Sequence, residues 1–426
     1  MTQITRRRFL IRGAASAGVL AGTALGGSLL TTRMAFGAPG HTADGRFVFI
    51  ILRGALDGLS AVPPYGDPAY TSLRGSLAIP APGGAGGALP LDGLFALHPS
   101  LAFLHECFAS KELTVLHAVA SPYRERSHFD GQDVLESGVA RAHASESGWL
   151  NRALSVQDGG PRPLGVALGS NVPLVMRGPA EVASWSPSQL ASLSEDTLQR
   201  VSDLYASDTV LSQRLADALA SDSIAAEGQP ASDEKMAAPD GAEGRPLAGA
   251  KRANPARFIQ TARAAASFLA REDGPRVAVL ETSGWDTHAN EGGAQGQLAQ
   301  RLAALDAGLR EFKSALGPAW RDTAVLLATE FGRTAATNGT RGTDHGTGSA
   351  AFLLGGAVAG GRVQCDWPSL GSASLYEGRD LRPTLDLRAA IKGVLHEQLK
   401  VSDRALEATV FPDSAGARRL EDLIRA

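Results

Sequence analysis

The fold class is decided by residues 324–334, AVLLATEFGRT, in which a short run of small and aliphatic residues leads directly into a polar loop. An unbroken apolar run of this length predicts a strand that is buried on both faces, as in parallel sheets. Two other runs share the pattern, since VAVL at 277–280 precedes the loop GWDTH and AAFLL at 350–354 follows the loop GTDHG. Because open α/β sheets bind ligands at the carboxyl ends of their strands, these loops predict a functional site.

Strands and helices alternate along the rest of the chain. FVFIIL at 47–52 and LTVLHAV at 113–119 predict two further buried strands, and residues 127–137 and 255–271 predict helices. Between residues 298 and 316, Leu and Phe recur at intervals of three and four, as in a helix packed on a sheet. The alternation predicts an α/β protein with a mostly parallel central sheet and helices on both faces.

A single domain is predicted over residues 44–415, in a chain that is 44% hydrophobic and can bury a full core. Ser192 and Glu195 form a capping-box pattern, which predicts a helix that runs to about residue 220. Residues 221–254 are rich in Ala, Gly, Pro, Ser and acidic residues and contain few large apolar side chains. This composition predicts a disordered insertion within the domain.

The N-terminus predicts export. Residues 5–10, TRRRFL, are typical of a twin-arginine signal, and residues 14–30 are only weakly apolar and rich in Gly and Ala. Small residues at 35 and 37 predict cleavage near Gly37, so that 1–37 is a signal peptide; an uncleaved anchor is the alternative. The predicted partner is the twin-arginine translocase. The mature protein is predicted to be periplasmic or secreted, without a stable membrane span.

Charge and cysteine content exclude several classes of protein. The chain has a formal net charge of -3 with 20% charged residues and no evident basic patch, which argues against a nucleic-acid partner. Cys107 and Cys365 are the only cysteines, too few for a disulfide scaffold or a zinc cluster. Their apolar surroundings predict packing residues, with a single bridge left as the alternative.

The polar loops contain the residue types of a metal site. Asp286 and His288 are two positions apart, so in an extended segment their side chains face the same side. Asp344 and His345 are adjacent, and the glycines on either side allow a tight turn. Carboxylate and imidazole ligands predict a divalent metal, and Zn, Mn, Mg and Ca all stay open. The alternative is that these side chains only cap strand ends.

Residues 124–130, RERSHFD, place Ser127 at the start of a predicted helix. The positive end of the helix dipole and its free amides favour an anion there, and a nearby metal would activate the hydroxyl as a nucleophile. Ser127 and Asp130 also form a capping-box pattern, so a simple cap is the alternative. The arginines suited to binding phosphate or sulfate in these loops are Arg53, Arg124, Arg126 and Arg333.

These motifs, with LRGALDGL at 52–59, resemble those of the exported family known as domain of unknown function 1501, over nearly all of residues 1–415. That family is grouped with the alkaline-phosphatase-like superfamily, which includes sulfatases and phosphodiesterases. The resemblance implies an alkaline-phosphatase-like fold. It also implies a metal-binding Asp after the first strand, here Asp57, and a Ser nucleophile at a helix start, here Ser127.

The superfamily pattern also implies roles for the later loops, with two departures. Asp286 and His288 would form a metal-binding pair, although at a shorter spacing than usual, and His345 would be the final ligand. Where the superfamily has Asp-His-Gly, this chain has Glu-Phe-Gly at 330–332, so one His is missing and Asp344 is the candidate replacement. The predicted metal ligands are Asp57, Asp286, His288, Glu330, Asp344 and His345.

The sequence therefore predicts an exported metal-dependent hydrolase that acts on a small anionic phosphate or sulfate ester. Ser127 would be the nucleophile, and Arg333 would assist catalysis by holding the anion. The alternative is a non-catalytic periplasmic binding or assembly protein that retains the fold, which the missing His favours.

Overall fold

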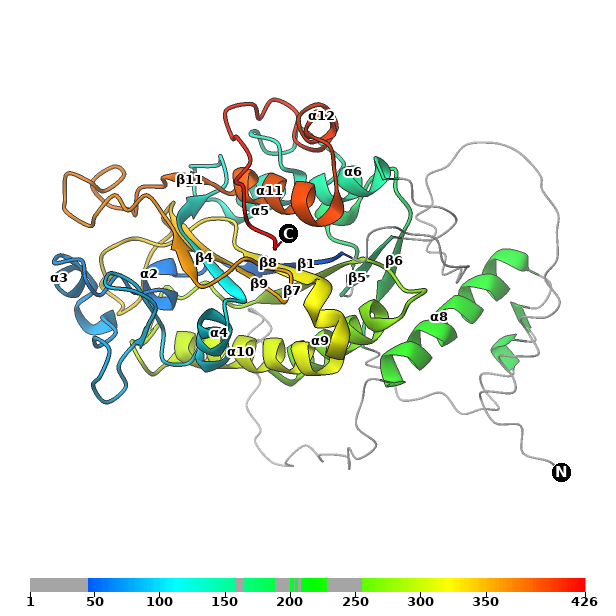
Figure 1. Cartoon of the computed structure of the whole chain (residues 1–426), viewed down its shortest axis with the longest axis horizontal. Helices are drawn as coiled ribbons and strands as arrows, with labels where there is room; N and C mark the ends of the chain where they lie inside the picture. Colours follow the sequence, from blue (N-terminus) through cyan, green and yellow to red (C-terminus); the bar gives the residue numbers. More distant parts are fainter. Residues whose placement is uncertain are drawn as a thin grey trace.

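The computed structural model describes residues 45–157, 164–169, 171–187, 200–202, 204–205, 208–227 and 255–425. The main sheet contains β1 (Arg46–Arg53), β4 (Leu113–Ala120), β5 (Gly165–Leu168), β6 (Val182–Trp185), β7 (Val277–Ser283), β8 (Thr323–Ala328), β9 (Ser349–Leu354), β10 (Arg362–Gln364) and β11 (Leu385–Asp386). Its order within the described residues is β10-β4-β9-β8-β1-β7-β5-β6, with β11 paired to β4 (Figure 1). A small antiparallel pair consists of β2 (Leu89–Pro90) and β3 (Ala96–Leu97).

The sheet is mostly parallel, as predicted. Parallel pairs join β1 to β7 and β8, β5 to β6 and β7, and β4 to β10 and β11. Only β9 departs from this within the main sheet of the described residues, because it runs antiparallel between β4 and β8. The predicted strands at 47–52, 113–119, 277–280 and 324–328 all lie within strands of this sheet.

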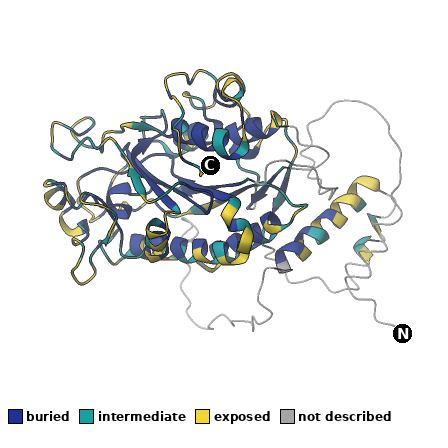
Figure 2. Ribbon diagram, viewed as in Figure 1, coloured by how far each residue is buried: buried dark blue, intermediate teal, exposed yellow. Residues whose placement is uncertain are grey.

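Both faces of the sheet are covered, which explains why the central strands are apolar at every position (Figure 2). Alternate residues of β1 enter two different cores: Val48, Ile50 and Leu52 enter one, and Phe47, Phe49 and Ile51 enter the other. The first core is covered by α4 (Ala102–Ala109), α9 (Pro255–Ala270) and α10 (Gln297–Leu316). The second is covered by α5 (His128–Ser137), α6 (Trp149–Ser155) and α11 (Leu387–Leu399).

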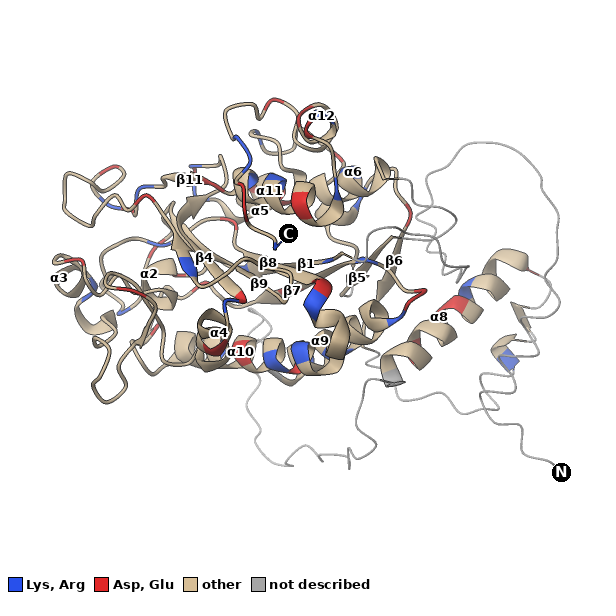
Figure 3. Ribbon diagram, in the orientation of Figure 1, with Lys and Arg blue, Asp and Glu red and all other residues tan. Residues whose placement is uncertain are grey.

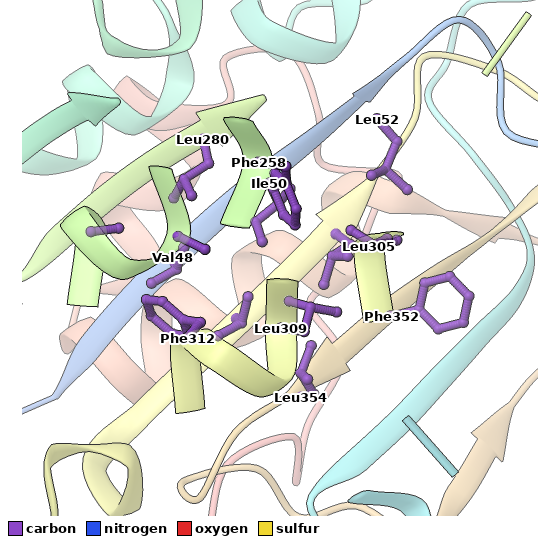
Figure 4. Close-up of a cluster of buried hydrophobic side chains, with 14 of the residues drawn as sticks. Val48, Ile50, Leu52, Phe258, Leu280, Leu305, Leu309, Phe312, Phe352 and Leu354 are labelled. Carbon is purple, nitrogen blue, oxygen red and sulfur yellow. The ribbon is translucent and has the colours of Figure 1, made fainter. Parts of the chain in front are cut away.

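The predicted helical stripe lies on α10 and faces the first core. Its residues, each at most 2% exposed, are Leu298, Leu302, Leu305, Leu309, Phe312 and Leu316. Figure 4 shows Leu305, Leu309 and Phe312 beside Val48 and Ile50 of β1. Each buried side chain of this size contributes roughly 1.5–3 kcal/mol through loss of apolar surface to water. Charged residues lie mainly on the outer helix faces and loops (Figure 3).

Several of the remaining helical segments are short. They are α2 (Gly58–Ala61), α3 (Tyr70–Arg74), η1 (Gly75–Leu77), η2 (Leu174–Met176), η3 (Gly317–Asp322), α12 (Asp403–Ala405) and η4 (Leu406–Val410). Cys107 is buried in the first core and Cys365 packs against its edge, and both are free thiols. Burial raises the pKa of each thiol to about 12. The packing interpretation of the cysteines is therefore confirmed.

Two predicted boundaries are corrected. Helix α8 (Thr209–Glu227) continues past residue 220, and Ile224 and Ala225 are buried on it, so 221–227 belong to the folded domain and not to an insertion. The domain also continues beyond residue 415, because Leu423 is buried and Ile424 forms a bridge with Val358.

Other parts of the predicted organisation lie outside the described residues. They are the signal peptide at 1–37, the capping box at 192–195 and residues 228–254. Among the helices of the described residues, none has the length and apolar character required to cross a membrane.

Candidate metal centre

One edge of the sheet brings together all the predicted site loops. The register pairs Arg53 at the end of β1 with Ser283 at the end of β7, and β8 ends beside the same part of β1. β4 runs in the same direction because it is antiparallel to β9, which is itself antiparallel to β8. The loops after β1, β4, β7 and β8 and the loop before β9 therefore meet at the carboxyl edge, where open α/β sheets place ligands.

Three imidazoles and one carboxylate converge there. Oδ1 of Asp286 lies 3.1 Å from Nε2 of His288 and 3.3 Å from Nε2 of His345, and the two Nε2 atoms are 3.0 Å apart. Nε2 of His128 lies 3.5 Å from Oδ2 of Asp286. We call His128, Asp286, His288 and His345 the histidine cluster.

The distances around Asp286 suit the ligands of a single ion. Ligands that bind one tetrahedral metal at about 2.0–2.2 Å lie roughly 3–3.6 Å from one another. In the described part of the chain, His128, Asp286 and His345 offer ligand atoms that all lie within 4.8 Å of one another. Nε2 of His128 is buried, and its contact with Oδ2 of Asp286 at 3.5 Å is at the limit of a hydrogen bond. A metal would satisfy this ring nitrogen more fully.

Each imidazole of the histidine cluster is anchored through its other ring nitrogen, Nδ1, to an oxygen acceptor. The three pairs are His128 with Oε1 of Glu330 at 2.8 Å, His288 with Oδ1 of Asp344 at 3.2 Å, and His345 with the carbonyl oxygen of Arg126 at 2.9 Å. An oxygen acceptor requires the hydrogen on Nδ1, so a neutral imidazole presents the lone pair of Nε2 to the cluster. Anchored histidines of this kind are typical of metal sites.

The structure corrects the predicted role of Glu330. Its fully buried carboxylate accepts hydrogen bonds from the backbone of Gly54 at 2.8 Å, from Gln132 at 3.1 Å and from Thr329 at 2.9 Å, besides contacting His128. Burial would raise the pKa of Glu330, but the hydrogen bonds, led by that of His128, lower it. Glu330 is therefore an ionised group that orients His128 and has little capacity left for a metal.

Asp344 is corrected in the same way. Its Oδ1 accepts a hydrogen bond from Asn338 at 3.0 Å and lies beside Nδ1 of His288. The hydrogen bond from Asn338 first, and then that from His288, lowers the pKa of Asp344. The carboxylate therefore faces the back of the imidazole and orients His288 without belonging to the converging atoms.

The electrostatics of the histidine cluster favour a cation. Burial would raise the pKa of Asp286, but hydrogen bonds from His128 and His345 and the charge of Arg333 hold it well below its usual range. Hydrogen bonds to Asp286 and then to Glu330 raise the pKa of His128 to about 9. In the absence of a metal, a proton on His128 supplies the positive charge that these carboxylates require.

Two glycines allow the loops to approach closely. A Cβ on Gly332 would lie 1.8 Å from the carbonyl oxygen of Gly348, so only glycine lets the loop after β8 touch the loop before β9. Gly54 has φ +119, a conformation that L side chains rarely adopt, and its Cβ would lie 2.8 Å from the backbone nitrogen of Asp286. The close approach of the loops at these two positions explains why the EFG and RGA segments need glycine.

Arg333 does not face a substrate site. It is 1% exposed, and its guanidinium donates to the carbonyl oxygens of Ala55 at 2.9 Å and Thr343 at 3.1 Å, as well as to the carboxylate of Asp286. These bonds hold three loops together and position Asp286. The predicted role of Arg333 in binding an anion is therefore replaced by a positioning role.

The other arginines of the predicted site are also engaged with protein groups. Arg53 pairs with Glu136 at 2.7 Å and Glu281 at 2.8 Å, Arg126 pairs with Glu377 at 2.6 Å and Asp380 at 2.8 Å, and Arg124 donates to the carbonyl oxygen of Tyr123 at 2.7 Å. Their hydrogen bonds go to neighbouring loops and helices, which removes the direct support for anion binding by these side chains.

Asp57 belongs to a second group of charged residues. Its Oδ1 accepts a hydrogen bond from the backbone of Ser60 at 3.1 Å, and its Oδ2 forms an ion pair with Arg74. Glu291 lies on the other side, with Oε1 at 3.6 Å from the same guanidinium. We call Asp57, Ser60, Arg74 and Glu291 the Arg74 cluster. The prediction of Asp57 as a metal ligand is corrected, because its carboxylate is bound by Arg74 and Ser60 and does not belong to the converging atoms of the histidine cluster.

Ser127 begins α5, as predicted, directly before His128. Its backbone is extended, with φ -93 and ψ 126, and its hydroxyl makes no capping hydrogen bond to the helix. Its backbone N–H donates to the hydroxyl of Tyr123 at 3.1 Å. The capping alternative therefore has no support in the geometry, and Ser127, which is half-buried, directly precedes a member of the histidine cluster.

The residue that the sequence reasoning missed is His128. It lies in the segment 124–130, directly after the predicted nucleophile Ser127. Its place near the metal could have been predicted, because a parallel β4 puts the start of α5 at the same edge of the sheet as the WDTH and TDHG loops. Its anchor Glu330 is 202 positions away in the chain, and no local pattern connects the two.

A cavity of about 260 Å³ adjoins the centre beside Asp344. Its walls include Leu73, Asn338 and Arg379. Arg379 is partly exposed and donates a hydrogen bond of 2.5 Å to the carbonyl oxygen of His345. The cavity is slightly smaller than a typical ligand pocket and combines apolar and polar walls.

The fold and the centre define an α/β protein with a candidate mononuclear metal site at the carboxyl edge of its sheet. The family described as protein of unknown function (DUF1501) matches residues 109–410, which is more than half of the chain. The protein belongs to this family, as its motifs predicted. No curated protein matches the chain significantly.

Solved structures with a similar course of the chain include two of Ps i-CgsB. The complex with k-i-k-neocarrahexaose has a TM-score of 0.37 and 11% identity, and the protein alone has 0.34 and 12%; each match covers 88% of this chain and 77% of the other. BT1596, described as a 2-O GAG sulfatase, has a TM-score of 0.28 and 10% identity, covering 73% of this chain and 64% of that one. Similarity at this level assigns no substrate to the present protein.

Proposed function

We propose that this protein is a metal-dependent hydrolase of phosphate or sulfate esters. The observation that carries the proposal is the convergence of three Nε2 atoms and one carboxylate, with Ser127 directly before one of the imidazoles. Three imidazoles and one carboxylate favour zinc over magnesium or calcium, which prefer oxygen ligands.

His128, Asp286, His288 and His345 would hold the ion, with Glu330, Asp344 and the carbonyl of Arg126 fixing the imidazoles. Such an ion supplies Lewis-acid polarisation of a phosphoryl or sulfuryl oxygen and lowers the pKa of a nearby hydroxyl. The site uses one ion, because Asp57 is already paired with Arg74 and both oxygens of Glu330 accept hydrogen bonds from the protein.

Ser127 would attack the phosphorus or sulfur atom of the ester. Its hydroxyl proton leaves to solvent as Oγ forms the new bond, and the ester oxygen departs with the bonding electron pair and takes up a proton. Water then cleaves the enzyme ester and regenerates the hydroxyl. The N-terminal amides of α5 lie beside Ser127, and the Ser127 side chain does not cap them. These amides would therefore stabilise the negative charge of the substrate.

The substrate would be a small anionic ester. Phe129 follows His128 on the first turn of α5 and is 86% exposed, which gives an apolar surface beside the centre. The cavity beside Asp344 would accept a further part of the same molecule, with Arg379 on its wall.

The test begins with the purified zinc-loaded protein and a panel of aryl phosphate, phosphodiester and aryl sulfate substrates. Ser127→Ala should abolish turnover while the melting temperature changes little, because the hydroxyl makes no capping bond. Ser155→Ala, at an exposed serine on α6, is the matched control and should keep full activity. Undiminished turnover in Ser127→Ala would exclude the covalent mechanism.

A non-catalytic metal-binding or assembly protein is the second candidate function. The burial of Arg333, which leaves no guanidinium of the central loops directed at an anion, favours it. In that case the protein would bind one metal and hydrolyse none of the three substrate classes.

We further propose that the protein is exported by the twin-arginine translocase to the periplasm or beyond. The motif TRRRFL at 5–10 supports this, and a pathway that carries folded proteins suits a metal bound before export. Replacing Arg6 and Arg7 together by Lys should leave the precursor in the cytoplasm. Export of that double variant by the same pathway would contradict the assignment.

A further inference from the structure

Glu291 forms hydrogen bonds with two of the loops that carry the candidate metal ligands. Its Oε2 accepts a hydrogen bond from the hydroxyl of Thr287 at 2.9 Å and another from the hydroxyl of Thr343 at 2.8 Å. Thr287 lies between Asp286 and His288, and Thr343 precedes the residues that orient and complete the histidine cluster. All three side chains are at most 2% exposed, so water does not compete for these bonds.

Glu291 is itself held in place, through its backbone at α10 and through its side chain at Ser60 and Arg74. The backbone oxygen of Glu291 accepts a hydrogen bond from Leu298 at 3.1 Å, at the start of α10. Its Oε1 accepts a hydrogen bond from Ser60 at 3.2 Å and lies 3.6 Å from the guanidinium of Arg74. Glu291 is thus attached to a helix of the first core on one side and to the loops on the other.

Arg74 forms hydrogen bonds with a third loop, the one that follows β8. Its Nη1 donates to the carbonyl oxygens of Thr334 and Ala335, each at 3.3 Å, just after Arg333. Arg74 is the cation beside Glu291, whereas burial and the neighbouring Asp57 raise the pKa of Glu291 to about 8. A fully buried carboxylate without these partners would be strongly unfavourable.

We propose that Glu291 is a positioning residue of the metal centre, which sets the separation of the WDTH and TDHG loops through Thr287 and Thr343. This inference rests on the proposed metal centre and deepens it, because it names a group outside the ligands and their anchors. A network that only stabilises the fold would leave metal affinity unchanged when one hydroxyl is removed. A positioning network lowers metal affinity, since outer groups that fix ligand geometry are typically responsible for about 10–100-fold in metal binding.

The experiment compares valine and serine at the same two positions of the full-length mature protein. Valine keeps the shape of threonine and removes the hydroxyl, whereas serine keeps the hydroxyl and loses only a methyl group. The double variant Thr287→Val with Thr343→Val should bind Zn²⁺ about 10–100-fold more weakly in a chelator competition. The double serine variant should bind as the wild type does.

Thr323→Val is the control for the loss of a buried threonine hydroxyl, because Thr323 donates to the carbonyl oxygen of Ala319 at 2.7 Å, away from the loops. It should lower the melting temperature without changing Zn²⁺ affinity. If the double valine variant does not fold, the two single variants give the same comparison. The visible spectrum of bound Co²⁺ provides a second readout, which should change in the valine variants only.

The outcomes separate the inference from the proposed function. Equal Zn²⁺ affinity and equal Co²⁺ spectra in the valine and serine variants would overturn the positioning role while leaving the metal centre intact. A wild-type protein that binds neither ion would exclude the metal centre, and with it the positioning role.

Discussion

The histidine cluster and the Arg74 cluster both lie at the carboxyl edge of the sheet and both contain a strand-end aspartate, but the groups around the two aspartates differ. In the Arg74 cluster, the carboxylate of Asp57 has a guanidinium of the chain as its partner and is 1% exposed. In the histidine cluster, Asp286 pairs with Arg333 and also has three imidazole Nε2 atoms at 3.1, 3.3 and 3.5 Å from its carboxylate oxygens.

The comparison shows that an acidic residue at a strand end is not by itself a metal ligand. An arginine pairs with the aspartate in both groups, Arg333 with Asp286 and Arg74 with Asp57, so the arginine does not distinguish them. What distinguishes the histidine cluster is the set of imidazole Nε2 atoms beside its carboxylate, which can bind a proton or a metal. Four predictions test this difference.

The largest effect is expected in the histidine cluster. His288→Ala combined with His345→Ala should reduce bound zinc from one equivalent to background, because two of the converging nitrogens are lost. His143→Ala is the control, since that imidazole pairs with Asp130 and Asp133 on α5 away from the cluster and its side chain is 67% exposed. Elemental analysis after dialysis measures the result. Retention of zinc by the double variant would remove the distinction between the two clusters.

Substitutions in the Arg74 cluster should lower the free energy of unfolding, because they remove a buried ion pair and no metal ligand. Arg74→Met leaves Asp57 and Glu291 buried without their cation, and removal of one partner from a buried ion pair typically costs about 3–5 kcal/mol. Urea unfolding of the zinc-free protein measures this change. Adding Asp57→Asn should recover part of the loss, and a fully stable Arg74→Met protein would show that the ion pair does not balance the buried charge.

The groups that orient the imidazoles should have an intermediate effect. Asp344→Asn removes the charge behind His288 while leaving the ligands in place, so zinc affinity should fall about ten-fold, near the lower end for such outer groups. Asp366→Asn, at an exposed aspartate, should bind zinc as the wild type does. Chelator competition distinguishes the two, and a complete loss of zinc in Asp344→Asn would indicate that Asp344 is a direct ligand.

The smallest expected effect is a change in the melting temperature of the metal-free protein with pH. Because the folded protein raises the pKa of His128 to about 9, its proton stabilises the metal-free fold below the ordinary histidine pKa of about 6.5, and this contribution is lost as pH rises toward about 9. The melting temperature of the chelator-treated protein should therefore fall between about pH 6.5 and 9. His128→Gln should lack this component of the decline, and an identical pH profile in both proteins would contradict the assignment to His128.

The sequence predicted the sheet and the edge at which the site lies, because both follow from local patterns. The apolar runs at 47–52 and 324–328 specify buried strands, and the stripe from 298 to 316 specifies a helix against them. The order of strands then brings the polar loops together. The helix at 209–227 was predicted too short because its last residues have the composition of a linker, although Ile224 and Ala225 reach the core.

The roles of individual acids could not be predicted, because they depend on partners far away in the chain. Glu330 orients His128 across 202 positions, and Asp57 is paired with Arg74 of α3. Nothing in the residues next to either acid distinguishes a metal ligand from an acceptor for an imidazole or a guanidinium. Only the spatial arrangement of the side chains makes that distinction.

The most direct test of the central claim is X-ray absorption at the zinc edge of the metal-loaded protein. One zinc with three imidazole nitrogens and a carboxylate oxygen at about 2.0–2.2 Å is the result that the histidine cluster predicts. A shell composed only of oxygen ligands, a second metal at short distance, or no bound metal would contradict it.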